Sequence, residues 1–535
     1  MNQVLYNEEA RQRIQEGAKI LYEAVKTTMG PRGGNVVFED ETGRPNVTHD
    51  GVTVAKNVNL VDDDSNAGRR MGAELIKQAA SKMNDVAGDG TTTVTVLTYH
   101  ILAEANKLIA AGYNPMVLRR EIEQHLPLII ETLDNLREDI AEDTKRIEEV
   151  ATISAGDSEI GKIIADIVGV IGKEGVITVE DSPTGQTTSE VVNGFTFDRG
   201  WMSPYMVTDT GKMEAVYENP AILVTDKSIS NVRELVPVLE KLAAAGKREL
   251  FLIADDIQGE ALSTLLANHI KGTFNVVAVR APGLGDRRRD ALADIATLTG
   301  ATVLSPDRET EFQDANENSI GSARRIIVTE TQTTIIEGAG IPEDIDAHVA
   351  SVGDRLEAST NEADKEYFSQ RKASLAGRVA VIRVGGSTET EMIERRYRVD
   401  DAVAATKAAL KEGIVSGGGV TLAYISWLLH DIPGEGAQVL AKAFEQPFRI
   451  LMENSGLVAE RWLHQISADK GIDVRNPDKL VDMKKAGVID PVVVTKQAVE
   501  NAISIAATAM TMGGLILRPK PTKAPSAEMF SNLGV

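Results

Sequence analysis

The chain has 535 residues, which is more than one hydrophobic core normally serves, so the sequence predicts two to four domains. Lysine and arginine total 57 against 79 aspartate and glutamate residues. The resulting net charge of −22 argues against nucleic acid or an anionic membrane as the main partner. Cysteine is absent from the sequence, which excludes disulfides, thiolate metal sites and cysteine nucleophiles.

The N-terminal residues show neither the basic region nor the apolar region of a signal peptide. No apolar run of roughly 18 residues, the length that crosses a membrane, occurs in the sequence. We therefore expect a cytoplasmic protein with no membrane partner.

The N-terminal part of the chain is predicted to be mostly helical. Apolar residues recur at helical spacing over residues 8–28 and the pattern stops at Gly30-Pro31, which predicts an amphipathic helix that ends in a turn. Short strands are predicted at residues 36–38 and 47–48. Residues 66–135 then show an almost wholly helical pattern.

The middle of the chain has a different pattern, in which apolar β-type runs alternate with helices between about residues 193 and 376. Three such runs lie at 221–224, 250–254 and 276–279. After residue 377, a strand leads into a long helix at about 388–411 and a mostly helical remainder. This order predicts an α/β domain inserted into a discontinuous helical domain. The proline-containing segment 519–535 is expected to be mobile.

The most informative motif is residues 88–97, Gly-Asp-Gly-Thr-Thr-Thr-Val-Thr-Val-Leu. Gly88 and Gly90 let the backbone approach an anion, and the threonines can donate hydrogen bonds to phosphate oxygens at a helix N-terminus. Asp89 can hold a metal ion. The motif therefore predicts a cradle for a triphosphate with Mg²⁺, although a capped helix without a ligand would explain the decapeptide alone equally well.

Further along the chain, the carboxylate pair Asp400-Asp401 lies in the predicted helix at 388–411. Asp401 lies next to the face that should be buried, where an acid is costly unless it is paired, bound to a metal or used as a base. The run 417–419 of three glycines precedes another helix and allows a ligand to lie against the backbone, but a tight turn would also explain it. The segment 156–162 has P-loop spacing, yet Ile163 follows it where that motif needs a hydroxyl, so we do not interpret it as a nucleotide site.

Taken together, these segments resemble the nucleotide site of group I chaperonins, the GroEL family, in order and spacing. The matching segments are 28–31, 49–51, 88–93, 398–401, 417–419 and 488–491. Residues 194–205 and 281–288 match the apical domain of that family, and the likeness runs from about residue 7 to 512.

The resemblance implies three domains, in agreement with the inserted α/β domain. They are an equatorial domain (1–135 and 407–535), an intermediate domain (136–192 and 377–406) and an apical domain (193–376). It also implies rings of seven subunits, a small lid co-chaperonin, non-native proteins as clients, and ATP, Mg²⁺ and K⁺ as cofactors.

Site residues can be carried over position by position. The resemblance implies nucleotide binding by Thr28, Met29, Gly30, Pro31, His49, Gly88, Asp89, Gly90, Thr91, Thr92, Thr93, Gly417, Gly418, Asp473, Val474 and Asp490. Asp89 would coordinate Mg²⁺, and Gly418 and Asp490 would meet the nucleoside. Asp401 would position and activate the hydrolytic water, with Asp50 near the γ-phosphate, because phosphoryl transfer depends on positioning and charge neutralisation.

In the apical domain, the family binds clients and its lid through an apolar groove. The matching positions are Trp201, Tyr205, Met206, Val236, Leu239, Leu262, Leu266 and Ala267. Such an exposed apolar surface recognises unfolded chains without sequence selectivity. Without the resemblance, these residues would be interpreted as ordinary core.

The sequence also departs from the family pattern. His49 stands where the family usually has lysine and Asp473 where it usually has asparagine, so nucleotide affinity is expected to differ. Leu457-Val458 replaces a charged pair near the contact between rings, which leaves open whether one ring or two form.

The sequence thus predicts an ATPase that acts as a folding chaperone. Two alternatives are a small-molecule α/β enzyme that uses the inserted domain, and a ring that binds nucleotide but barely hydrolyses it.

Overall fold

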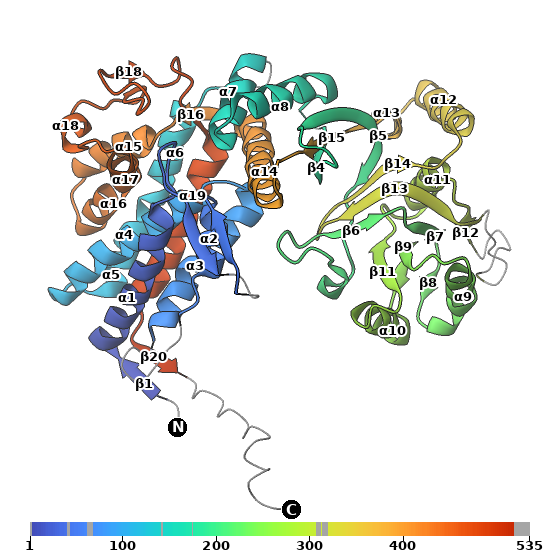
Figure 1. The fold of residues 1–535 in the computed structure, drawn as a ribbon, viewed down its shortest axis with the longest axis horizontal. Coiled ribbons are helices and arrows are strands. Elements are labelled where there is room, and N and C mark those ends of the chain that lie inside the picture. Colours follow the sequence, from blue (N-terminus) through green and yellow to red (C-terminus); the bar gives the residue numbers. More distant parts are fainter. Residues whose placement is uncertain are drawn as a thin grey trace, which may run out of the picture. The chain divides into compact units, whose positions relative to one another are not determined.

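The computed structural model describes residues 3–39, 43–60, 68–140, 143–173, 175–305, 312 and 319–517. The chain forms two compact units (Figure 1). Unit 1 comprises Met1–Lys173, Val179–Thr188 and Arg383–Val535, and unit 2 comprises Glu174–Thr178 and Ser189–Ile382. The predicted multidomain α and α/β organisation is confirmed. The three predicted domains stay a prediction, and the segment expected to be mobile lies outside the described residues.

The core of unit 1 is a bundle of four long helices that pack on one another. They are α1 (Asn7–Lys26), α3 (Arg69–Ala87), α4 (Thr91–Ala110) and α19 (Val492–Met510). Small residues permit this packing. For example, a Cβ atom on Gly17 of α1 would lie 1.8 Å from the carbonyl oxygen of Arg69 on α3, so only glycine allows the two helices to approach so closely.

Shorter helices complete unit 1. They are α2 (Gly51–Asn57), α5 (Pro115–Gln124), α6 (Leu126–Leu136), α15 (Val420–His430), α16 (Glu435–Phe444), α17 (Gln446–Asn454) and α18 (Glu460–Leu463). A second group of helices that contact one another consists of α7 (Thr144–Ala155), α8 (Ser158–Ile171) and α14 (Glu389–Glu412). The predicted helices at 8–28 and 388–411 are therefore present as α1 and α14.

In the described residues of unit 1, strands also form four antiparallel pairs. They are β1 (Gln3–Tyr6) with β20 (Gly514–Leu517), β2 (Val36–Glu39) with β3 (Pro45–Thr48), β16 (Ile414–Ser416) with β19 (Ile489–Pro491), and β17 (Lys470–Gly471) with β18 (Val481–Asp482). The pair β2–β3 was predicted from the sequence. The pairs β1–β20 and β16–β19 join residues that are far apart in the chain and were not predicted.

Unit 2 contains most of a mixed sheet in the order β11-β9-β7-β13-β14-β5-β15-β4, with β12 paired to β7 and β6 to β13; residues 179–181 of β4, Thr188 of β5 and residues 383–384 of β15 belong to unit 1. Its strands are β4 (Val176–Asp181), β5 (Thr188–Phe197), β6 (Ala215–Glu218), β7 (Ala221–Thr225), β9 (Glu249–Ala254), β11 (Asn275–Arg280), β12 (Val303–Leu304), β13 (Gly321–Val328), β14 (Thr333–Gly338) and β15 (Arg378–Val384). A short parallel pair, β8 (Ser228–Ile229) and β10 (Asp256–Ile257), lies outside this sheet.

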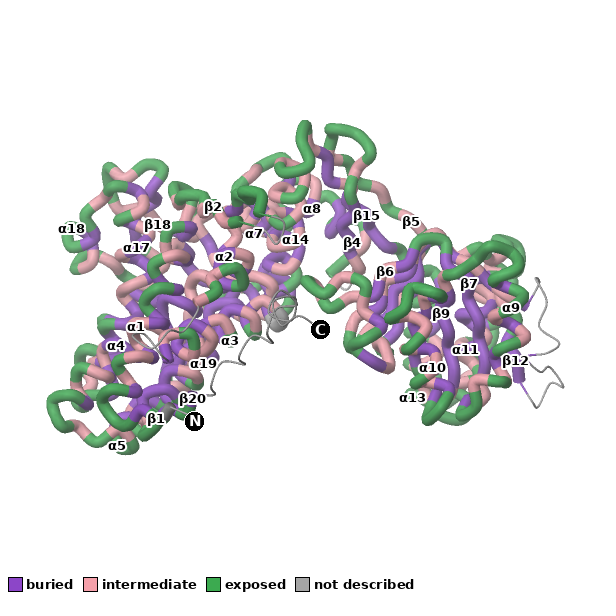
Figure 2. The backbone as a smooth tube through the Cα atoms, turned by 60° about the horizontal axis from the view of Figure 1, so that its bottom comes forward, coloured by how far each residue is buried: buried purple, intermediate pink, exposed green. Residues whose placement is uncertain are grey.

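The three predicted apolar runs are the parallel strands β7, β9 and β11. Their residues are almost all buried and are coloured purple along the backbone in Figure 2. Parallel strands need crossover connections, which are usually helices, and here α9 (Val236–Ala244) and α10 (Gly259–Ile270) supply them. The remaining helical elements of unit 2 are α11 (Asp286–Thr299), α12 (Pro342–Ala358), α13 (Glu362–Leu375) and the 3₁₀ turns η1 (Pro204–Met206) and η2 (Val232–Glu234).

Candidate functional site

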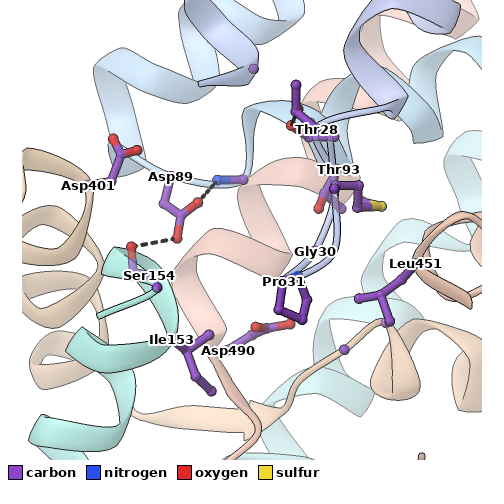
Figure 3. A pocket seen from close by; sticks show the side chains of 18 of the residues that line it. Thr28, Gly30, Pro31, Asp89, Thr93, Ile153, Ser154, Asp401, Leu451 and Asp490 are labelled. Atoms are coloured by element: carbon purple, nitrogen blue, oxygen red, sulfur yellow. Dashed lines mark hydrogen bonds between the residues drawn. The ribbon is translucent and has the colours of Figure 1, made fainter. Parts of the chain in front are cut away.

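A cavity of about 640 Å³ lies within unit 1, where loops and helix ends from distant parts of the chain meet (Figure 3). Most of the predicted equatorial and intermediate site residues line it. They are Thr28, Met29, Gly30, Pro31, His49, Asp50, Asp89, Gly90, Thr91, Thr92, Thr93, Asp401, Gly418, Asp473, Val474 and Asp490. Gly88 and Gly417 are not among the residues that line the cavity.

One wall of the cavity is the junction of α3 and α4. Gly88 ends α3 and Gly90 precedes α4, and both have left-handed backbone angles (φ of 65° and 80°) that favour glycine. The first N–H groups of a helix have no partner within that helix, so the start of α4 is suited to an anion. The Thr28 hydroxyl lies 3.4 Å from the Thr92 hydroxyl and joins this wall to the turn that follows α1.

Although Gly88 and Gly417 do not line the cavity, both allow close approaches beside it. A Cβ on Gly88 would lie 2.3 Å from the Cβ of Ala404, so this glycine lets α14 approach the cavity one turn beyond Asp401. A Cβ on Gly417 would lie 3.0 Å from Asp490 Oδ1. These two glycines therefore act on the shape of the site and not on a ligand directly.

Six of the carboxylates that the structure describes line the cavity, those of Asp50, Asp89, Glu394, Asp401, Asp473 and Asp490. Asp89 accepts hydrogen bonds from the Gly90 N–H group and, at 3.4 Å, from the Ser154 hydroxyl, as Figure 3 shows. Asp50 lies at the start of α2.

The Asp50 carboxylate accepts from the N–H groups of Val52 (3.1 Å) and Thr53 (2.8 Å). Asp50 is thus a helix N-cap as well as a residue of the cavity wall.

Burial and nearby charges shift the pKa values of several side chains that line the cavity. Burial, together with the nearby charge of Asp50, raises the pKa of Asp89. Burial and the charge of Asp89 raise the pKa of Asp490 to about 7. Burial and the positive charge of Arg398 lower the pKa of His49. A bound cation would offset the repulsion between these carboxylates.

The donor set fits Mg²⁺ bound together with phosphate. Among the described residues, no group of three or more histidine, aspartate or glutamate side chains is arranged to hold a metal ion by itself. Mg²⁺ is usually held in proteins by one or two carboxylates together with phosphate oxygens and water. Asp89, next to the anion-binding start of α4, matches that pattern.

A family model described as the TCP-1/cpn60 chaperonin family matches residues 21–519. The chain belongs to this family. This confirms the resemblance noted from the sequence. The chaperonin is also similar to two crystal structures of the chaperonin gp146 from the bacteriophage EL 2 (Pseudomonas aeruginosa), both obtained in the presence of ATP-BeFx.

The two phage structures have 22% and 21% sequence identity to this chain and TM-scores of 0.66 and 0.61. Each match covers 97% of this chain and 99% of the phage chain. At this identity, the likeness establishes the fold. In the part of this chaperonin that the structure describes, no helix is long and apolar enough to cross a membrane.

Several residues of the cavity wall were not predicted from the sequence. They include Thr152, Ile153, Ser154, Ala155 and Gly156 at the end of α7, Glu394 and Tyr397 on α14, Pro447 and Leu451 on α17, and Arg475. Gly156 belongs to the segment that we dismissed as a P-loop, and it lies in the turn between α7 and α8. No local motif marks these residues, because only tertiary packing brings them to the cavity.

Two of the departures from the family pattern, His49 and Asp473, lie in the cavity wall of this chaperonin. His49 precedes the N-cap of α2. Asp473 is buried, and its Oδ1 accepts from the Arg475 N–H group (3.0 Å) and Arg475 Nε (3.1 Å). The Asp473 carboxylate is therefore already neutralised by a neighbouring guanidinium before any ligand binds.

In unit 2, the predicted client-binding residues form part of a surface over α9, α10 and η1. The core side of these helices consists of Val238 and Leu242 on α9 and Ala261 and Leu265 on α10, all buried. Leu239, Leu262, Leu266 and Trp201 are half-buried, and Val236, Tyr205 and Ala267 are exposed. Both helices contact η2, and α10 contacts η1, so these residues share one region.

Met206 differs from the other predicted client-binding residues because it is fully buried in the core of unit 2. Its sulfur atom accepts from the Ala278 N–H group at 3.3 Å. Met206 therefore supports η1 from inside and does not present an apolar surface. Conversely, Ile270 at the end of α10 is 67% exposed and was not predicted.

Unit 2 also contains a charged cluster that the sequence did not reveal. Asp294 on α11 is 2% exposed and accepts from Arg371 Nε (2.6 Å) and Nη2 (2.7 Å) on α13. His348 Nε2 on α12 lies 2.6 Å from the same carboxylate. Because a guanidinium already pairs with Asp294, this arrangement fastens three helices together and does not resemble an enzyme's acid–base pair.

The pKa of Asp490 gives a stability prediction for the nucleotide-free chaperonin. Between about pH 4 and pH 7, folded Asp490 holds a proton that the unfolded chain releases, so stability falls as pH rises and is level above that range. Over this pH range the free energy of unfolding falls by about 4 kcal/mol in total. Asp490→Asn removes this loss, and we expect its thermal midpoint to exceed that of the wild type by several degrees at pH 8 and by less than half that shift at pH 5.

The matched control for this experiment is Asp431→Asn, which changes an exposed aspartate outside the cavity. It should leave the thermal midpoint unchanged at both pH values. An Asp490→Asn variant that is no more stable than the wild type at pH 8 would contradict the assignment of a raised pKa.

Proposed function

We propose that this chaperonin is an ATPase that captures non-native proteins and encloses them in a ring chamber, with ATP hydrolysis timing the cycle. The observation that carries the proposal is the cavity in unit 1. It combines the N-terminus of α4, the turn after α1 and several carboxylates, which are groups that suit a triphosphate with a divalent cation.

In this proposal, the turn Thr28–Pro31 and the threonines Thr91–Thr93 hold the phosphates. Asp89 holds Mg²⁺, and bound Mg²⁺ neutralises charge on the phosphate oxygens. Gly418, Val474 and Asp490 contact the nucleoside. K⁺ is a further cation of the proposed cycle.

Asp401 is the proposed base that positions the attacking water. It lies on α14 and faces the same cavity as Asp89, whereas its neighbour Asp400 does not line the cavity. Asp50 is the second proposed catalytic carboxylate. Its bonds to the first turn of α2 hold its position, which suits a role in orienting groups near the terminal phosphate.

The proposed client site is the apolar surface formed by α9, α10 and η1. Tyr205 is 68% exposed and Val236 is 37% exposed, and with the half-buried Leu239 and Leu266 they belong to an apolar surface of the kind that binds other proteins. We place the contact with a small lid protein on the same surface. Met206 is omitted from this site because it is buried.

We further propose the three domains predicted above and a cytoplasmic ring of seven copies, single or double. Two surfaces of unit 1 support self-association. The hairpin β2–β3 exposes Val37 (63%) and Val47, and the pair β1–β20 exposes Tyr6 and Ile516. Two-stranded sheets with apolar faces are rarely stable alone and tend to pair with further strands.

The test is a combined measurement of assembly and folding on the purified chain. Light scattering should report about 400 kDa for seven copies of the 57.5 kDa chain, or about twice that for fourteen. A chemically denatured protein should regain activity with the chaperonin and Mg-ATP, but not with the chaperonin alone. A monomeric mass, or refolding that does not depend on ATP, would contradict the proposal.

A further inference from the structure

The C-terminal end of α17 contacts the turn that follows α1 and holds it in place. Asn454 is the last residue of α17, and its Nδ2 atom donates to the carbonyl oxygens of Lys26 (2.9 Å) and Met29 (3.0 Å). An amide nitrogen has two N–H groups, so these two bonds use both of them. Because both partners are carbonyls, the nitrogen and not the oxygen of Asn454 must face the turn.

Two apolar contacts from the preceding residues of α17 reinforce these bonds. Ile450 and Met29 belong to the same small apolar cluster. Leu451 lies against the left-handed Gly30, where an added Cβ would be 3.1 Å from Leu451 Cγ (Figure 3). The end of α17 thus packs apolar side chains against Met29 and Gly30. The single amide of Asn454 also holds the carbonyl groups at both ends of Lys26–Met29.

The turn held in this way carries Thr28, whose hydroxyl lies 3.4 Å from that of Thr92 at the start of α4. These two segments form opposite parts of the proposed phosphate cradle. A carbonyl that loses its donor must find water or another partner, and the surrounding backbone then loses its fixed geometry. Asn454 itself does not line the cavity, so it can affect a ligand only through the turn.

We propose that Asn454 is a positioning residue for nucleotide binding, which holds the turn Thr27–Pro31 in the conformation that receives the phosphates. This inference rests on the proposed function, because it assigns a ligand to the turn. It adds a role for the end of α17, a helix that carries no nucleotide motif in the sequence.

The test compares the Kd for Mg-ATP of the full-length wild type with that of Asn454→Ala, by titration calorimetry. We expect the variant to bind roughly 5- to 30-fold more weakly, since two hydrogen bonds to the turn are lost. Asn454→Asp should lose at least as much, because a carboxylate of the same shape has no N–H group to donate. The control is Gln446→Ala at the other end of α17, whose amide donates to Lys442 and not to the turn.

Hydrogen exchange separates positioning from general loosening. In the nucleotide-free Asn454→Ala variant, faster exchange should be confined to peptides that cover residues 27–34, while α1 and α17 stay protected. Mg-ATP affinity within twofold of the wild type would overturn the inference, and so would equally faster exchange throughout the helices of unit 1.

If Asn454→Ala does not fold, the Kd for Mg-ATP and the hydrogen exchange are measured on Asn454→Ser instead, which keeps one donor. The same two results then support or overturn the inference. If the wild type itself binds no Mg-ATP, the proposed function fails before this inference is reached.

Discussion

Replacing Asp401 with alanine is expected to lower steady-state ATP hydrolysis by roughly 10²- to 10⁴-fold while Mg-ATP binding changes by no more than a few-fold. The reason is the location of this side chain. Asp401 lines the same cavity as the α4 N-terminus and Asp89, yet it lies on α14, which is not one of the segments that would hold the phosphates. A carboxylate that acts only on the attacking water contributes to the transition state and little to ground-state binding.

The neighbouring residue provides a matched control for this experiment. Asp400 is an aspartate on the same helix, also half-buried, but it does not line the cavity. Asp400→Ala should therefore retain turnover within a few-fold of the wild type. The measurements are kcat from phosphate release and Kd from calorimetry. Unchanged turnover in Asp401→Ala, or an equal loss in Asp400→Ala, would contradict the proposed role of Asp401.

Asp50 should behave differently from Asp401 in the same assay. Its carboxylate caps α2 through the N–H groups of Val52 and Thr53, and loss of an N-cap costs about 1 kcal/mol. Asp50→Ala should therefore lower both stability and activity. Asp401, within a continuous helix, has no such capping role, and this makes it the cleaner test of catalysis.

Local chemistry allowed much of the cavity to be predicted from the sequence. Gly88-Asp89-Gly90 and the following threonines form a recognisable unit because the glycines permit left-handed backbone and the threonines begin a helix. The turn after α1 was found in the same way, from the end of a helical apolar pattern at Gly30-Pro31. These predictions needed only neighbouring residues.

The remaining cavity wall could not be predicted from local patterns because it depends on tertiary packing. Ser154, Leu451 and Asn454 lie in ordinary helical sequence, and only the packing of α7 and α17 brings them to Asp89 and to the turn. The same is true of β1–β20, in which residues from opposite ends of the described chain pair. Met206 shows the opposite error, since its match to the family pattern did not reveal that the side chain points into the core.

Client capture should also be sensitive to the substitution of a few residues. We expect the double variant Leu239→Glu/Leu266→Glu to bind a denatured protein roughly 30- to 700-fold more weakly than the wild type. Each leucine contributes on the order of 1–2 kcal/mol when a client covers it, and a charge at that position must be dehydrated instead. Capture can be measured as the concentration of chaperonin that suppresses aggregation of a chemically denatured protein.

The control must add negative charge to the same region without removing apolar surface. Ser263→Glu does so, because Ser263 is an exposed polar residue of α10. It should capture clients nearly as well as the wild type, and all variants should show the wild-type mass in light scattering and the wild-type rate of ATP hydrolysis. Since the proposed nucleotide cavity lies wholly within unit 1, loss of capture with retained hydrolysis would locate client binding in unit 2. Retained capture in the double variant would refute the apolar-surface assignment, and loss in Ser263→Glu as well would show that charge and not apolar contact is responsible.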